Sequence, residues 1–305
     1  MVGGLSSLGG YPERVVLRDV GPRDGLQAEA PVSVEDRVRL IDALTAAGFT
    51  KIEAASFVSP KAVPAMAGAG EVLAAIERRP GILYSALVPN RRGAEAAVRA
   101  GADALTGFLA ASDGYNRKNV GKSVEESVRD VVDVVEVARG AGLPVEATIS
   151  SAFGDPYEGD VTPERVAEVA ARLADGGVEA FSLGDTTGMA SPPRIVAVVE
   201  AVRARLPGHS LNLHLHDTRG AAMANAVVAL QEGVTEFDVS IGGLGGSPFA
   251  PAAGGNLATE DFAHLLADMG IETGLDLRAL LAAAEVAREL VGHDLWSHLP
   301  RAAPR

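Results

Sequence analysis

The sequence predicts a single (β/α)8 barrel, and three observations support that fold class. Eight short runs of aliphatic and β-branched residues recur along the chain, and an amphipathic helical pattern follows each of them. Neighbouring runs are roughly 25–35 residues apart, which suits βα units. Helical patterns end in glycine before the next run, at Gly48, Gly101, Gly177 and Gly233. The alternative is an open dinucleotide-binding sheet, but no GxGxxG motif follows the first run.

The predicted strands are short and aliphatic, as strands of a buried parallel sheet are. In chain order they are residues 14–21, 51–57, 82–88, 104–110, 144–150, 179–185, 211–217 and 236–242. Apolar residues make up 47% of the chain, so it can bury a substantial core around these strands. We expect one catalytic domain over residues 1–305, because single-domain barrels commonly have this length.

A helix is expected after each strand, and two of the helix starts carry capping signals. Ser33 is the expected N-cap of the first helix, with Glu35 and Asp36 in the first turn. Thr162 before Pro163 is the usual order of an N-cap and a proline at the first helical position. The other helices are expected at about 64–78, 91–100 and 122–140, from 191, from about 259, and at 277–291.

Composition and charge exclude several functional classes. The net charge is −13, and no basic stripe is available to neutralise phosphates, so no nucleic-acid partner is expected. The chain has no cysteine, which excludes disulfides, thiolate metal sites and cysteine nucleophiles. Its first ten residues do not resemble a secretory signal, and no apolar run is long enough to cross a bilayer. We expect a cytoplasmic protein with no membrane partner.

Chemically active side chains gather at the carboxyl ends of four predicted strands, where TIM barrels hold their active sites. They are Arg23, Asp24, Glu53, Ser56, Asp185, His214, His216 and Asp217. His214 and His216 are two residues apart on a strand, so both side chains point to one face. Two imidazoles with carboxylate or amide oxygen suit Mg²⁺, Mn²⁺, Zn²⁺ or Fe²⁺. The alternative is that the two histidines lie in the core with their ring nitrogens satisfied by hydrogen bonds. Asp24, at the end of another strand, favours a metal site over this alternative.

Each of the other charged positions has both a structural and a functional interpretation. Arg23 and Asp24 are either a surface ion pair in a turn or an oxyanion-stabilising arginine beside a metal-bound aspartate. Glu53 lies inside a strand, where a buried carboxylate needs a partner, and Arg23 is the obvious candidate. Asp185 is either an active-site residue or the N-cap of the helix that follows it.

Eight stretches of sequence carry a resemblance to a known family. They are VGPRDGLQ, IEAASFVSPKAVPAM, FLAASDGYNRKN, GDPYEG, SLGDTTG, HLHDTRG, GGLGGSPFA and GGNLATED. In their order and spacing, over nearly the full length of the chain, they resemble the 3-hydroxy-3-methylglutaryl-CoA lyase family of the DRE-TIM metallolyases. The resemblance implies that Asp24, His214, His216 and Asn256 bind a divalent metal, Mg²⁺ or Mn²⁺.

The resemblance also assigns catalytic roles. It implies that Arg23 stabilises the enolate of the departing acyl-CoA, that Glu53 supports Arg23, and that Asp185 is an acid–base residue. The positions that match substrate and coenzyme A contacts are Ser56, Tyr157, Lys118 and Asn119. The implied reaction is retro-aldol (retro-Claisen) cleavage of a 3-hydroxyacyl-CoA, such as 3-hydroxy-3-methylglutaryl-CoA, into an oxo acid and acetyl-CoA.

Two alternatives to this activity stay open at the level of sequence. One is a related lyase or aldolase that acts on another 3-hydroxy acid or thioester, such as a citramalyl-CoA analogue. The other is a catalytically silent metal-binding barrel, although the intact set of charged residues argues against it. The sequence also leaves the oligomeric state open, with a homodimer as one option.

The sequence departs from the family pattern near the glycine-rich segment 242–255, which is expected to be an active-site lid. Ser247 occupies the catalytic position where the family's lid carries a cysteine, and a serine cannot supply a thiol proton. Arg219 stands where a tyrosine is expected and would add a cation near the metal, while Pro251 would stiffen the lid. These changes fall on positions expected near the substrate, whereas the implied metal ligands all match the family.

Overall fold

The fold is a closed parallel barrel in which the eight strands follow one another in chain order. The computed structural model describes residues 10–246 and 255–302. The strands are β1 (Val16–Asp19), β2 (Lys51–Ser56), β3 (Leu83–Val88), β4 (Ala104–Ala110), β5 (Val145–Ser150), β6 (Ala180–Asp185), β7 (Ser210–Leu215) and β8 (Glu236–Val239). All eight predicted strands are confirmed, and β1 pairs with β8 to close the barrel.

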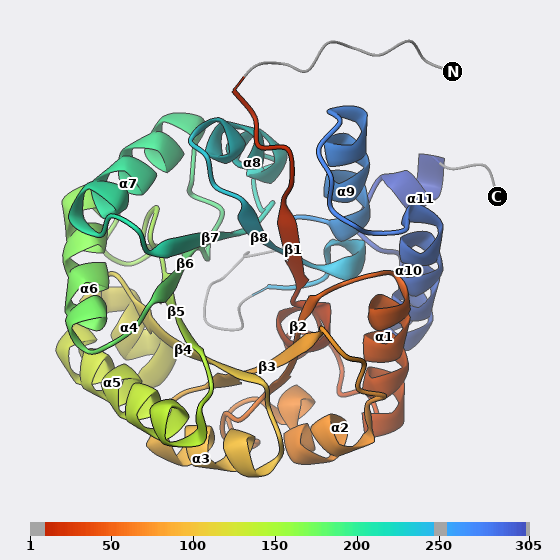
Figure 1. The fold of residues 1–305 in the computed structure, drawn as a ribbon, viewed down its shortest axis with the longest axis horizontal. Coiled ribbons are helices and arrows are strands. Elements are labelled where there is room, and N and C mark those ends of the chain that lie inside the picture. The colour runs from red at the N-terminus through yellow and green to blue at the C-terminus, as the bar shows by residue number, and fades with distance from the viewer. Residues whose placement is uncertain (1–9, 247–254, 303–305) are drawn as a thin grey trace.

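The helices form a ring around the barrel (Figure 1). They are α1 (Val34–Ala46), α2 (Ala69–Ala75), α3 (Arg91–Arg99), α4 (Asp113–Val120), α5 (Val124–Ala141), α6 (Pro163–Asp175), α7 (Pro192–Arg205), α8 (Ala222–Gln231), α9 (Thr259–Asp268), α10 (Leu277–Val291) and α11 (Leu299–Ala302). Helices α9, α10 and α11 complete the ring between α8 and α1 (Figure 1). None of the helices in the described ranges is long and apolar enough to span a membrane.

Local signals set most helix ends. Ser33 accepts a hydrogen bond from the Asp36 backbone and Thr162 accepts one from Arg165, as predicted. The four glycines after helices have φ between +73° and +100°, a left-handed conformation that favours glycine.

One helix prediction was wrong, and one helix was not predicted. The predicted helix at 64–78 is broken, because Gly68 has φ +76° and separates a 3₁₀ turn (Pro64–Met66) from α2. The segment before α5 forms the additional helix α4, which ends at Gly121 with φ +73°. A capping box at Ser123 then starts α5.

The barrel interior holds a buried ionic layer as well as aliphatic side chains. Arg18 on β1 donates two hydrogen bonds to Asp238 on β8, at 2.7 and 2.9 Å. The same guanidinium lies 2.6 Å from Glu146 on β5. Burial opposes ionisation of Asp238, but Arg18 outweighs it and holds the Asp238 pKa well below its usual range. The three charged side chains of this layer therefore fix one another inside the barrel.

Candidate active site

Asp24 and Arg23 lie on a single π-helical turn, Gly21–Gly25, that follows β1. The carbonyl oxygen of Val20 accepts hydrogen bonds from the backbone nitrogens of Arg23, Asp24 and Gly25, which winds the turn tightly. A Cβ at Gly21 would come within 2.9 Å of both Asp19 and Ile241, so only glycine fits at the start of the turn. The turn presents both side chains, nearly fully buried, to the centre of the barrel.

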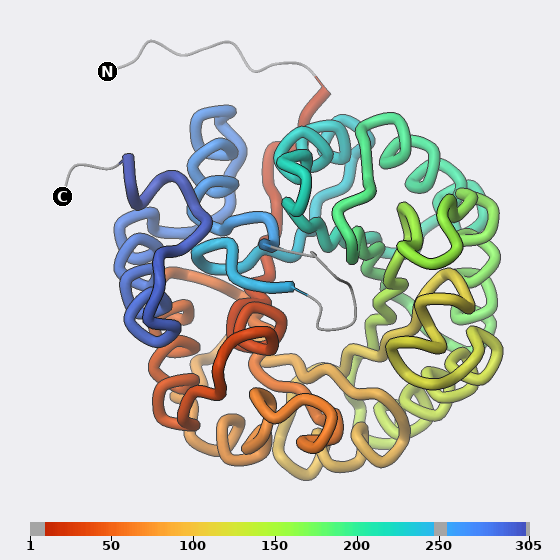
Figure 2. The backbone as a smooth tube through the Cα atoms, turned by 180° about the vertical axis from the view of Figure 1, so that it is seen from behind, coloured from red at the N-terminus to blue at the C-terminus, as the bar shows by residue number. Residues whose placement is uncertain are grey.

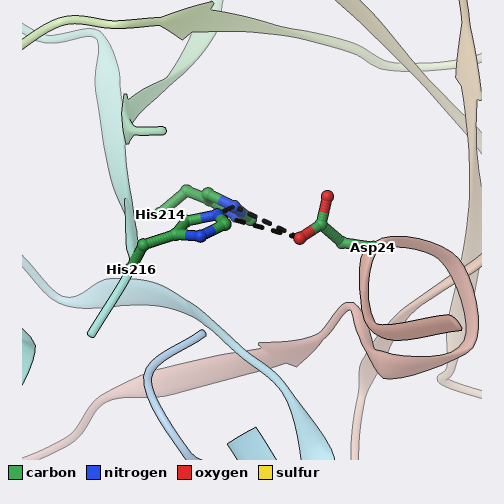
Figure 3. Close-up of side chains that lie close together, drawn as sticks. All are labelled: Asp24, His214 and His216. Atoms are coloured by element: carbon green, nitrogen blue, oxygen red, sulfur yellow. Dashed lines mark hydrogen bonds and ion pairs between the residues drawn. The ribbon is translucent and has the colours of Figure 1, made fainter. Parts of the chain in front are cut away.

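Asp24 and the two histidines form a compact cluster (Figure 3). The Nε2 atoms of His214 and His216 lie 3.0 Å apart, and each lies 3.8 Å from Oδ2 of Asp24. Two ligands about 2.1 Å from one ion and at right angles to each other would lie roughly 3 Å apart. The three ligand atoms therefore converge at a spacing that fits a divalent cation.

Asn256, the predicted fourth ligand, lies beside Asp24. A backbone bridge to His216 places it there, across the end of β7. Its Nδ2 donates to Oδ2 of Asp24 at 2.8 Å and to the carbonyl oxygen of Leu244 at 2.9 Å. A Cβ at Gly245 would fall 2.0 Å from this nitrogen, so Gly245 permits the contact. Ligation through Oδ1 requires the amide to turn.

The protonation states of Asp24 and His216 suit metal ligands. Burial opposes ionisation of Asp24, but Arg23 and the two histidines outweigh it and lower the Asp24 pKa. Burial, with the neighbouring His214, lowers the pKa of His216 to about 4. Asp24 is therefore ionised and His216 neutral near pH 7, and these are the forms that donate electron pairs to a cation.

Asp238 is a site residue that sequence reasoning missed. Its Oδ2 lies 3.1 Å from Nδ1 of His214, on the side of the ring away from the cluster. A carboxylate at Nδ1 orients the ring and leaves Nε2 free to act as a ligand. Burial lowers the pKa of His214, but the bond to Asp238 and the charge of Asp24 outweigh burial and raise it. The available signal was an aspartate inside the otherwise apolar eighth strand.

The predicted pairing of Arg23 with Glu53 is confirmed. Nε of Arg23 donates to Oε2 of Glu53, and Nη1 lies 2.5 Å from Oδ1 of Asp24. Burial opposes the charge of Arg23, but Glu53 and Asp24 outweigh it and raise the Arg23 pKa. The alternative of a surface ion pair between Arg23 and Asp24 is wrong, because Arg23 is only 8% exposed and Asp24 only 5%.

Asp185 does not cap the following helix, since α7 starts at Pro192 with Ser191 as its N-cap. Oδ1 of Asp185 instead accepts a hydrogen bond from the Ala190 backbone at 2.9 Å. Its Oδ2 is buried and has no hydrogen-bond partner among the described residues. Burial raises the pKa of Asp185 to about 6. A buried carboxyl with that pKa and one oxygen without a hydrogen-bond partner among the described residues can exchange a proton near neutral pH.

A cavity of about 110 Å³ joins the cluster to the carboxyl ends of several strands. Asn119 lines it, whereas Ser56, Lys118 and Tyr157 do not. Lys118 instead places its Nζ 5.9 Å from the centre of the half-exposed Tyr157 ring. Residues that line the cavity without having been predicted are Gln27, Val58, Val63, Leu87, Phe108, Tyr115, Thr148, Ser150, Gly184, Thr186 and Gly246.

Two further sequence expectations concern the edges of the site. Asp217 is exposed and caps the start of α8 by accepting from the Ala222 backbone, so it is not part of the cluster. Arg219 donates to the carbonyl oxygens of Thr187 and Gly188, which ties it to the loop after β6 instead of the cavity.

Ser247 and Pro251 lie outside the described residues. Figure 2 shows that the described ends of the 242–255 segment lie at the centre of the ring.

Comparison with known proteins gives the same family over nearly the whole chain. The model of the HMGL-like family matches residues 14–287. The chain is 45% identical to a hydroxymethylglutaryl-CoA lyase of Bacillus subtilis, over 94% of this chain and 96% of that protein. It is 44% identical to a 3-hydroxy-3-isohexenylglutaryl-CoA/hydroxymethylglutaryl-CoA lyase of Pseudomonas aeruginosa, over 95% and 97% of the two chains.

A solved structure agrees with these matches in three dimensions. An HMG-CoA lyase from Acinetobacter baumannii, in complex with coenzyme A and 3-methylmalate, superposes with a TM-score of 0.92 at 38% identity. The match covers 95% of each chain.

Proposed function

The chain belongs to the HMGL-like family, and from that premise we propose that it cleaves 3-hydroxy-3-methylglutaryl-CoA into acetyl-CoA and acetoacetate. The observation that carries this proposal is the position of the ion pair between Arg23 and Glu53. Its guanidinium lies directly beside Asp24, and Arg23, Asp24, His214 and His216 line one cavity. A group that stabilises negative charge therefore adjoins a cation-binding set.

The proposed step breaks the bond between C2 and C3 of the substrate. A base removes the proton of the C3 hydroxyl, the bond electrons pass to C2, and C3 becomes the ketone of acetoacetate. The other product forms as the enolate of acetyl-CoA and takes a proton at C2. A divalent cation bound by Asp24, His214, His216 and Asn256 would lower the pKa of the C3 hydroxyl.

The described residues supply the other functions that this step needs. We assign Asp185 as the base, because its Oδ2 has no hydrogen-bond partner among the described residues and its pKa is about 6. Arg23 stabilises the enolate oxygen, and Glu53 with Asp24 holds its guanidinium in place. Asn119 and the neighbouring wall of the cavity bind the coenzyme A portion.

We propose Mg²⁺ or Mn²⁺ as the cation. Carboxylate and amide oxygens favour these hard ions. The absence of cysteine removes the ligand that most favours softer metals. Residues 1–305 are proposed to form one catalytic domain, with 242–255 closing over the substrate.

A second candidate substrate is another 3-hydroxyacyl-CoA with a different group at C3. The Pseudomonas relative carries both activities in its name. In this chain Ser247 stands where the family's lid cysteine is expected, and this difference is the reason to test that substrate class.

The decisive experiment measures acetoacetate release from 3-hydroxy-3-methylglutaryl-CoA by the purified protein, with Mg²⁺, with Mn²⁺ and after chelation. Ser247→Cys is assayed beside it, together with a substrate that has a longer C3 group. Metal-dependent release is expected. Acetoacetate release that persists after chelation would contradict the proposed role of the metal. No turnover by either protein would contradict the proposed substrate.

Metal content after dialysis tests the ligand set separately. His216→Ala is expected to bind less Mn²⁺ than the unaltered protein does, and an unchanged stoichiometry would contradict the assignment. A protein that binds Mn²⁺ but cleaves neither substrate would be the catalytically silent metal-binding barrel that the sequence left open as an alternative.

A further inference from the structure

The loop between β5 and α6 contains a small closed unit that carries a buried carboxylate. The backbones of Asp155 and Gly159 exchange two hydrogen bonds of 2.8 Å, which closes the segment on itself. The Asp155 side chain is 1% exposed, although no cation pairs with it in the described part of the chain. A buried carboxylate without a cation needs several hydrogen-bond donors.

Those donors come from two different elements, one for each carboxylate oxygen. Oδ1 of Asp155 accepts from the backbone nitrogens of Tyr157 at 2.6 Å and Glu158 at 3.3 Å, within its own loop. Oδ2 accepts from the Tyr115 nitrogen at 3.0 Å and from the Ser112 hydroxyl. The carboxylate therefore joins the loop to the first turn of α4.

This contact replaces a missing helix cap. Ser112 is at the N-cap position of α4, but its side chain makes no capping hydrogen bond. The Tyr115 nitrogen, which an N-cap side chain would normally bind, donates to Asp155 instead. A negative charge at a helix N-terminus also interacts favourably with the helix dipole.

Side-chain packing brings the same two elements together. A Cβ at Gly114 would lie 2.7 Å from the Glu158 side chain, so loop and helix touch at that point. The rings of Tyr115 and Tyr157 lie 6.3 Å apart, and Nζ of Lys118 lies over the Tyr157 ring. The side of α4 that holds Tyr115 and Asn119 lines the cavity.

We infer that Asp155 is a positioning residue that fixes α4, one wall of the cavity, against the Asp155–Gly159 loop and so sets the affinity for the acyl-CoA substrate. It does not touch the reacting atoms and lies apart from the metal cluster. The inference rests on the proposed function, because the wall is taken to bind a coenzyme A thioester.

The test compares Asp155→Ala and Asp155→Asn with Asp160→Asn. Asp160 is the matched control, because its carboxylate lies in the same loop but is 78% exposed and pairs with Arg194 on the outside. KM and kcat are measured for 3-hydroxy-3-methylglutaryl-CoA, with Mn²⁺ affinity and amide hydrogen exchange of residues 113–120 and 155–159. Calorimetry gives the Kd for coenzyme A alone.

Asp155→Ala is expected to raise KM and the Kd for coenzyme A by about tenfold, as for loss of a charge-assisted hydrogen bond. kcat and Mn²⁺ affinity should change less than about threefold, and exchange should accelerate in both segments together. Asp155→Asn should give a smaller change of the same kind, and Asp160→Asn none.

A folded Asp155→Ala protein with unchanged KM and unchanged Kd would overturn the inference, as would a loss confined to kcat. If the unaltered protein binds coenzyme A but does not cleave the substrate, the proposed function fails, and the Kd values still decide the role of Asp155. If it binds no coenzyme A, both fail.

Discussion

The Nδ1 atom of His214 lies 3.1 Å from Oδ2 of Asp238, and the two residues are also register partners on the adjacent strands β7 and β8. Arg18 holds the same carboxylate through two further hydrogen bonds. The ring of His214 is therefore oriented from beneath by an anion that is itself fixed in place.

Asp238→Asn is expected to weaken Mn²⁺ binding by about 10–100-fold, because it removes the charge that orients His214. Calorimetric titration of Mn²⁺ measures the effect. Glu146→Gln is the matched control, since it removes the other carboxylate beside Arg18 without touching His214. Both variants should lose thermal stability, and only Asp238→Asn should lose metal affinity. Equal affinity losses in the two variants would assign the effect to general disruption of the ionic layer.

Arg23→Met is expected to lower kcat by about 10²–10³-fold, the usual loss when a group that stabilises a developing oxyanion is removed. Glu53→Gln should give a smaller loss, because the guanidinium stays but loses its main anchor. Steady-state kinetics of both variants and of the double variant measure this. Since Glu53 acts through Arg23, the double variant should be no slower than Arg23→Met, and additive losses would contradict this relationship.

The pH dependence of kcat/KM is expected to follow Asp185. Burial raises its pKa to about 6, and a base works only when deprotonated, so activity should rise with pH, reach half its maximum near pH 6 and level off about one pH unit higher. Asp185→Asn should lower kcat by about 10²–10⁴-fold. The residual activity of this variant should no longer rise near pH 6. A rise that persists in the variant would assign the titration to another group.

Asp19 is expected to make the protein less stable as the pH rises. Its carboxylate is fully buried and accepts bonds from the Gly21 nitrogen and the Thr259 hydroxyl, both at 2.7 Å. Burial nevertheless raises its pKa to about 7. The folded state therefore holds this proton between about pH 4 and 7, where the unfolded state has released it, and unfolding becomes easier as the pH increases.

Asp19→Asn removes this titration. The free energy of unfolding of the unaltered protein, relative to the variant, should fall by about 3 kcal/mol between pH 5 and pH 8. Urea unfolding of both proteins at the two pH values measures the difference. A difference that does not depend on pH would show that Asp19 does not titrate in this range.

The sequence predicted the fold and part of the site because the signals involved are local. Strand hydrophobicity, the caps at Ser33 and Thr162, and the glycines after helices each depend on a few neighbouring residues. The pairing of Arg23 with Glu53 was also predictable, because a buried carboxylate needs a polar or charged partner and the sequence offered Arg23 as a candidate. The break at Gly68 and the helix α4 were missed because short helices are weakly determined by local preference.

By itself, the sequence determined that eight βα units form and that Asp24, His214 and His216 follow the carboxyl ends of strands. It could not determine which side chains support them from other elements. The register of β8 against β7 and β1 decided that Asp238 lies between His214 and Arg18. The packing of the β5–α6 loop on α4 likewise decided that Asp155 caps a helix 40 residues away. Such contacts depend on barrel closure and strand stagger, which bring together residues whose separation along the chain carries no local signal.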